Sequence, residues 1–161
     1  MGQLLDLRPG DDAERLAAMQ PGQILARGVV RHLTACHGFA CLEEFSPTRG
    51  LRTDVTAIGP KGEIWVVECK SSRADFQSDL KWQGYLEWCD RYFWAVAGDF
   101  PQELLPEGTG ILLADAWDAA IHRPAPEAKM ASARRKAVTT KFARCAAQRL
   151  AWARDPGWSA V

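Results

Sequence analysis

Apolar residues recur at helical spacing in two stretches near the N-terminus and in one stretch near the C-terminus. The first helix is predicted from residue 11 or 12 to about residue 19, after a flexible tail over 1–10. A second helix is predicted over 23–37, following the breaker Pro21-Gly22, and Gly38 is its expected end. The chain therefore opens with two short helices.

Short runs of β-branched and aromatic residues alternate with turn signals in the middle of the chain. They predict strands at 41–45, 51–58, 64–70, 92–97 and 110–114, and an edge strand at 119–123. The strands 51–58 and 64–70 are joined by Gly59-Pro60-Lys61-Gly62, a loop typical of antiparallel neighbours. A helix is predicted over 74–89, with candidate buried positions at Phe76, Leu80, Tyr85 and Trp88.

The order of helix, three strands, helix and strand predicts an α/β fold in the α+β arrangement, a mixed sheet with helices on its faces. Two further strands and a long helix follow, predicted over about 127–153 after Pro124 and Pro126, with Val138, Phe142 and Cys145 docking it on the sheet. No linker divides the chain, and its 161 residues fit a single domain, 1–161.

Composition narrows the class of protein. The five cysteines are an odd set with no C-x-x-C pair, which argues against a disulfide framework and against a zinc ribbon. No run of ~18 apolar residues is present, so we expect no membrane partner and a cytoplasmic location.

Charge is unevenly placed although the formal net charge is zero. Between residues 128 and 154 lie eight Lys or Arg and no acid, so an acidic body carries a basic C-terminal helix. The cluster Arg134, Arg135 and Lys136 has the charge to follow a DNA backbone. A solvated face that balances the acidic body is an equally good interpretation.

The predicted hairpin carries the candidate chemistry. Side chains alternate across a strand, so Glu68 and Lys70 point to the same face. If the turn closes symmetrically, Asp54 lies opposite Glu68, with Cβ atoms roughly 4.5 to 5.5 Å apart. Two such carboxylates repel each other unless a proton or a cation lies between them.

A Mg²⁺ or Mn²⁺ ion would meet that need, because such ions take carboxylate and carbonyl oxygens and keep several waters. Asp54, Glu68 and the carbonyl of Cys69 make a partial shell, and Lys70 could position the attacking water. An isolated Glu-x-Lys is usually an exposed, solvated pair. The apolar strand before it and the matched Asp54 favour the functional interpretation.

The pattern D-x(13)-E-x-K on a hairpin, followed by a helix and a strand, resembles the PD-(D/E)XK nuclease superfamily. Longer strings resemble the MmcB family of bacterial DNA repair proteins, over about residues 23–150. These strings are RTDVTAIGPKGEIWVVECKSSRADFQSDLKWQGYLEWCDRYFWAV, LLPEGTGILLADA and APEAKMASARRKA.

That resemblance implies a restriction-endonuclease-like core, a divalent metal and cleavage of DNA phosphodiesters by Asp54, Glu68 and Lys70. Superfamily members often add an acid from the first core helix, but residues 23–37 contain none. Either Glu43 or Glu44 replaces it, with Glu43 preferred, or the metal site is incomplete.

Two further DNA contacts are predicted, Arg73 from its position in the chain and Lys81 from the resemblance. Arg73 follows the catalytic strand, and Lys81 stands where some relatives carry the glutamine of a Q-x-x-x-Y signature. We therefore expect a metal-dependent DNA endonuclease acting in repair. The alternative is a weak or inactive nuclease fold that binds DNA or a repair protein, and a homodimer remains open in both cases.

Overall fold

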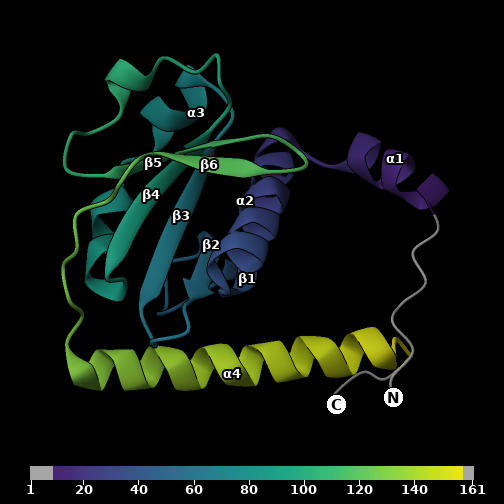
Figure 1. Ribbon diagram of the computed structural model, residues 1–161. Helices are drawn as coiled ribbons and strands as arrows, with labels where there is room; N and C mark the ends of the chain where they lie inside the picture. Colours follow the sequence, from purple (N-terminus) through teal and green to yellow (C-terminus); the bar gives the residue numbers. More distant parts are fainter. Residues whose placement is uncertain (1–8, 158–161) are drawn as a thin grey trace.

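A six-stranded mixed sheet forms the centre of the computed structural model, which describes residues 9–157 (Figure 1). Its strands follow one another in chain order. The first three pair antiparallel, β3, β4 and β5 pair parallel, and β6 returns antiparallel to β5. The bounds are β1 Ala40–Phe45, β2 Thr53–Ile58, β3 Ile64–Lys70, β4 Arg91–Val96, β5 Gly110–Ala114 and β6 Ala119–Arg123.

Helices cover both faces of this sheet. The α-helices are α1 Pro9–Ala18, α2 Pro21–His37, α3 Arg73–Ser78 and α4 Ser132–Arg154, and two 3₁₀ helices are η1 Trp82–Trp88 and η2 Gln102–Leu104. On one face α2 buries Val29 and Leu33 against Val67 and Phe93. The other face forms a second core, in which η1 and α4 join the side chains of β3 and β4. The predicted α/β class with a mixed sheet is confirmed.

The start of α2 differs from the expectation. Pro21-Gly22 was expected to precede the helix, but Pro21 is its first residue. Proline suits the first turn, where its missing N–H would have had no helical partner. Gly38 ends the helix with φ 68°, as predicted. Of the predicted tail, 1–8 lies outside the described residues, whereas residues 9 and 10 begin α1.

The helix predicted over 74–89 is wrong as one continuous element. It consists of α3 and η1, separated at residues 79–81, and the side chain of Leu80 is 86% exposed instead of buried. The carboxylate of Asp79 turns away from the helix and pairs with Lys70 of β3. This ion pair joins two separate elements, and helical periodicity within one segment does not report it.

The long helix α4 begins at Ser132, five residues later than predicted. The preceding segment is held in a non-helical conformation by Asp90, whose carbonyl accepts from Ala128 N and whose carboxylate accepts from Met130 N. Val138 and Phe142 are buried as predicted. Within residues 9–157, no helix has the length and apolar character needed to cross a membrane.

Candidate active site

The hairpin brings Asp54 and Glu68 together. The register pairs Val55 with Val67, so Asp54 and Glu68 form the next opposed positions. Asp54 N donates to Glu68 Oε1 at 3.4 Å, and Cys69 N donates to Asp54 Oδ2 at 2.7 Å. The expected juxtaposition of the two carboxylates is confirmed, because both lie at the carboxyl end of β3.

Burial makes two charges at this point costly. Only 4% of Glu68 is exposed, and burial, reinforced by the charge of Asp54, raises its pKa to about 9. Burial also raises the pKa of Asp54, although the hydrogen bond from Cys69 N opposes this rise. At neutral pH the pair therefore binds a proton, or a cation in its place.

Lys70 shares this end of β3 and is held by an acid that the sequence pattern did not identify. Its Nζ lies 2.8 Å from Asp79 Oδ2, and only 7% of Lys70 is exposed. Burial alone would lower the pKa of Lys70, but the hydrogen bond and charge of Asp79 raise it above its ordinary value. Lys70 is therefore a fixed cation beside the two carboxylates.

A cavity of about 300 Å³ opens over these groups. Its lining includes Glu44, Asp54, Glu68, Cys69, Lys70 and Asp75, together with Gln20, Gly22 and Gln23. The first core helix thus contributes amides rather than an acid, and Gln20 N donates to Gln23 Oε1 at 2.8 Å. Asp75, also missed from sequence, accepts from Ser71 N at 3.1 Å.

The preference for Glu43 over Glu44 was wrong. Glu43 pairs with Val55, whose side chain belongs to the core beneath α2, and it lines a different cavity beside Arg27 and Arg31. Opposed residues on antiparallel strands share a face, so Glu43 lies on the side away from Glu68. Glu44 lines the cavity over Asp54 and Glu68 instead, which we name the candidate active-site cavity.

Glu44 has an unusual backbone conformation, with φ 49°, whereas the other positive φ angles in the described chain belong to glycines. Arg149 of α4 binds this point: its Nη1 donates to the carbonyl of Glu43 and its Nη2 to that of Glu44, at 3.0 Å for the latter. A guanidinium fork suits two neighbouring acceptors. The C-terminal half of α4 therefore supports the backbone from which Glu44 enters the cavity.

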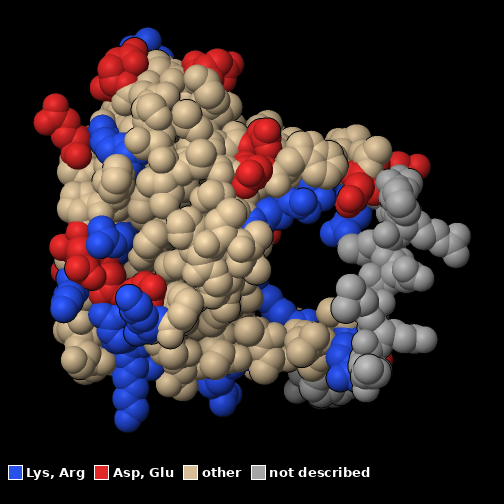
Figure 2. Space-filling view, in the orientation of Figure 1, with Lys and Arg blue, Asp and Glu red and all other residues tan. Residues whose placement is uncertain are grey.

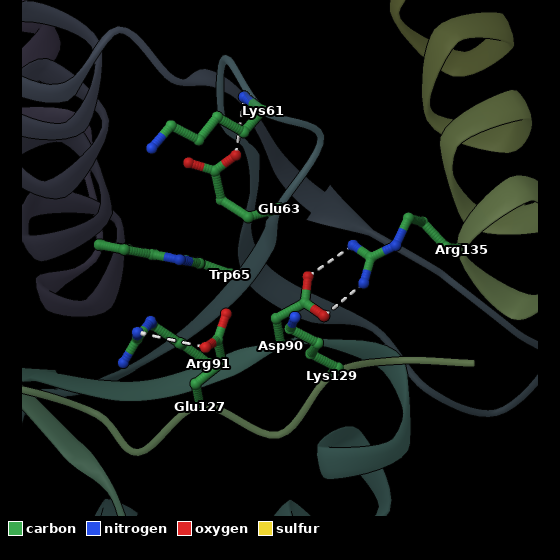
Figure 3. Close-up of a pocket in the computed structure, with 8 residues that line it drawn as sticks. All are labelled: Lys61, Glu63, Trp65, Asp90, Arg91, Glu127, Lys129 and Arg135. Carbon is green, nitrogen blue, oxygen red and sulfur yellow. Dashed lines mark hydrogen bonds and ion pairs between the residues drawn. The ribbon is translucent and has the colours of Figure 1, made fainter. Parts of the chain in front are cut away.

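The basic cluster Arg134, Arg135 and Lys136 lies near the end of the sheet opposite to the one that carries Glu68 and Lys70. Arg135 donates through both Nη atoms to the carboxylate of Asp90, each at 2.6 Å (Figure 3). Its Nη1 also donates to the carbonyl of Gly62. Arg134 binds Glu87. Gly62 and Asp90 lie before β3 and β4, roughly 20 Å from the carboxyl end of a seven-residue strand.

The sequence alone did not show which end of α4 lies near the candidate site, and contact of this cluster with DNA stays a prediction. Arg134 and Arg135 bind structural partners, and Lys136 is exposed beside them. Arg73 and Lys81 are also exposed, and neither lines the candidate active-site cavity. Contact of Arg73 and Lys81 with DNA stays a prediction.

Within residues 9–157, no group of three or more His, Cys, Asp or Glu side chains is arranged to hold a metal ion. The available donors are the two carboxylates of Asp54 and Glu68, with backbone carbonyl oxygens near them. Mg²⁺ and Mn²⁺ often bind through one or two carboxylates and keep their remaining waters. The donor chemistry therefore fits such an ion, whereas it does not fit zinc.

Comparison with known proteins adds a family. A solved structure of a protein of unknown function from Silicibacter pomeroyi is similar, with a TM-score of 0.87, 66% identity, and coverage of 89% of this chain and 98% of that one. No curated protein matches. The family model described as DNA repair protein MmcB-like matches residues 13–157, so the chain belongs to the MmcB-like family of DNA repair proteins.

Proposed function

We propose that this DNA repair protein is a Mg²⁺- or Mn²⁺-dependent endonuclease that hydrolyses phosphodiester bonds in DNA. One observation carries the proposal: the buried carboxylate of Glu68 and the half-buried carboxylate of Asp54 share one end of a hairpin with the ammonium of Lys70. Together with membership of a DNA repair family, this arrangement favours phosphodiester hydrolysis over other reactions of a metal-carboxylate site.

The metal would be held by Asp54, Glu68 and the carbonyl of Cys69, with Glu44 as a further acid at the cavity. When bound, a divalent ion supplies charge for the phosphate and acidifies a water. It would also offset the burial and the repulsion by Asp54 that together raise the pKa of Glu68 to about 9. The need for positive charge between the two acids supports metal binding.

Lys70 would contribute a donor and a positive charge. Its ammonium is fixed by Asp79 at 2.8 Å, so little rotamer entropy is lost when a phosphate binds. Because its pKa is raised, Lys70 is protonated at neutral pH. It would therefore orient water and stabilise the growing charge on the phosphate oxygens, and it would not act as a general base.

A second candidate is a nuclease fold that binds DNA or a repair partner without cutting. It is favoured by the amides of Gln20 and Gln23, which line the cavity where superfamily members often carry an acid. A homodimer and a cytoplasmic location stay predictions under both candidates.

The test is cleavage of nicked, flapped, mismatched and single-stranded DNA with Mn²⁺ by the full chain. We expect the wild type to cut at least one substrate, and we expect Asp54→Ala, Glu68→Gln and Lys70→Ala to reduce cutting at least 100-fold. Glu63→Gln is the matched control, because Glu63 precedes the same strand but lies at its far end. Its rate should equal that of the wild type.

Cleavage that survives in Asp54→Ala and Lys70→Ala would refute the assignment. Calorimetry with Mn²⁺ separates the two candidates. Absence of Mn²⁺ binding and of cutting on every substrate, with DNA affinity intact, would establish the binding module in place of the nuclease.

A further inference from the structure

Two basic cavities adjoin the candidate active-site cavity on opposite sides. The first, of about 580 Å³, lies between α1 and α2, and Arg15, Arg27 and Arg31 line it. It shares Gln23 with the candidate active-site cavity. Asp12 and Glu43 also belong to its lining, so positive charge exceeds negative charge there by one.

The second cavity, of about 400 Å³, lies between the end of β1 and α4. Lys141, Arg144 and Arg149 line it, and it shares Glu44 with the candidate active-site cavity. Lys141 and Arg144 are three residues apart on the helix and so lie on neighbouring parts of its surface. Positive charge therefore flanks the candidate metal ligands on both sides.

Figure 2 shows a gap between α1 and α4, here called the notch, with Lys and Arg side chains on its upper and lower sides. The charges are of two kinds. Arg15, Lys141 and Arg144 are exposed and form no ion pair with any residue of 9–157. They are available to a ligand that enters the notch.

Arg27 and Arg31 are held in place instead. They donate to the carbonyls of Ala116 and Trp117, each at 2.8 Å, and their guanidinium groups lie 4.6 and 5.9 Å from the centre of the Trp117 ring. Arg27 also approaches Asp12 at 3.4 Å. Fixed guanidinium groups bind phosphate with a smaller loss of entropy than free ones.

We infer that this notch is the DNA-binding cleft, and that its two walls bind phosphates on either side of the bond to be cut. The inference deepens the proposed function and rests on it only for the position of the scissile phosphate. A polyanion explains why cations from three separate helices line two cavities that adjoin the same candidate site in an otherwise neutral chain. It also assigns DNA contact to the middle and C-terminal part of α4, from Lys141 to Arg149, instead of its N-terminal cluster.

The test compares two charge-reversed proteins that carry an additional Asp54→Asn to prevent cutting. One is Lys141→Glu/Arg144→Glu. The matched control, Lys61→Glu/Lys129→Glu, makes the same change of charge at the other end of the sheet, where both exposed lysines line the cavity around Asp90. Binding of a fluorescein-labelled 20-mer, as duplex and as single strand, is measured by anisotropy over 50–200 mM KCl.

We expect the Lys141/Arg144 protein to lose at least tenfold in affinity. Its log–log salt dependence should fall by about 1.4 to 1.8, because each lost phosphate contact contributes about 0.9 on duplex and about 0.7 on single strands. The control should change affinity less than twofold, and Arg15→Glu should weaken binding from the opposite wall. Circular dichroism and thermal unfolding establish that each protein is folded.

Equal losses in the two double variants, or no loss in either, would overturn the cleft. Its failure is distinguishable from failure of the proposed function. If the wild type cuts DNA and Lys141→Glu/Arg144→Glu cuts as fast at subsaturating substrate, the cleft is rejected and the nuclease stands. If no protein cuts but binding depends on both walls, the nuclease is rejected and the cleft stands.

Discussion

Replacing Glu68 by glutamine should stabilise the metal-free protein, and the gain should depend on pH. The folded-state pKa of Glu68 is about 9 against an ordinary 4.5, because burial and the charge of Asp54 disfavour the carboxylate. Between pH 4.5 and pH 9 the folded protein therefore binds more protons at this position than the unfolded chain does. Stability conferred by this group is present below pH 4.5 and is lost as the pH rises toward 9.

The size of the effect follows from the two pKa values. One pKa unit corresponds to about 1.4 kcal/mol. Keeping Glu68 protonated in the folded protein therefore lowers the free energy of unfolding by about 3 kcal/mol at pH 7 and by less than about 1 kcal/mol at pH 5. The amide introduced by Glu68→Gln does not titrate and avoids this cost. For a chain of 161 residues, about 3 kcal/mol corresponds to a rise in Tm of roughly 6 to 12 °C.

The assay is thermal and urea unfolding of the wild type and of Glu68→Gln in EDTA at pH 5, 6 and 7. Saturating Mn²⁺ should reduce the difference in stability between Glu68→Gln and the wild type. An ion present at 100 times its Kd stabilises the wild type by about 2.7 kcal/mol, whereas the variant lacks one of the ligands of the ion. A variant that exceeds the wild type in stability by the same amount at pH 5 and pH 7, or that is less stable than the wild type at pH 7, would contradict the argument.

Three other substitutions test the surroundings of the site. Asp79→Asn removes the charge that raises the pKa of Lys70, so the alkaline limb of the cleavage-rate profile should move to lower pH, with kcat affected more than KM. Arg149→Ala leaves two carbonyls of β1 without their donor and should lower stability to urea by about 1 to 3 kcal/mol, with Arg149→Lys restoring only part because an ammonium lacks the fork. Arg135→Ala leaves the buried carboxylate of Asp90 without its cation and should lower the free energy of unfolding by about 3 to 5 kcal/mol. The DNA affinity of the folded protein should stay unchanged. A large loss of affinity would instead place Arg135 in the DNA interface.

Local pattern was sufficient for several features. The alternation in β2 and β3, with a short Gly-Pro turn between them, predicts the register, and the register places Asp54 opposite Glu68. Strand geometry requires this once the turn length is known. Likewise, a glycine after an amphipathic stretch predicts the end of α2 at Gly38.

Contacts between distant segments decided the remainder. Asp79, at the end of α3, pairs with Lys70 of β3, and Arg149 supports the φ 49° conformation of Glu44 from across the molecule. A sequence pattern reports periodicity within a segment and carries no information about which end of a helix meets a given strand. The sequence by itself therefore determined the hairpin and its three charged residues, whereas only the tertiary structure decided the choice of Glu44 over Glu43, the partner of Lys70 and the half of α4 that faces the site, because each depends on how separate elements pack.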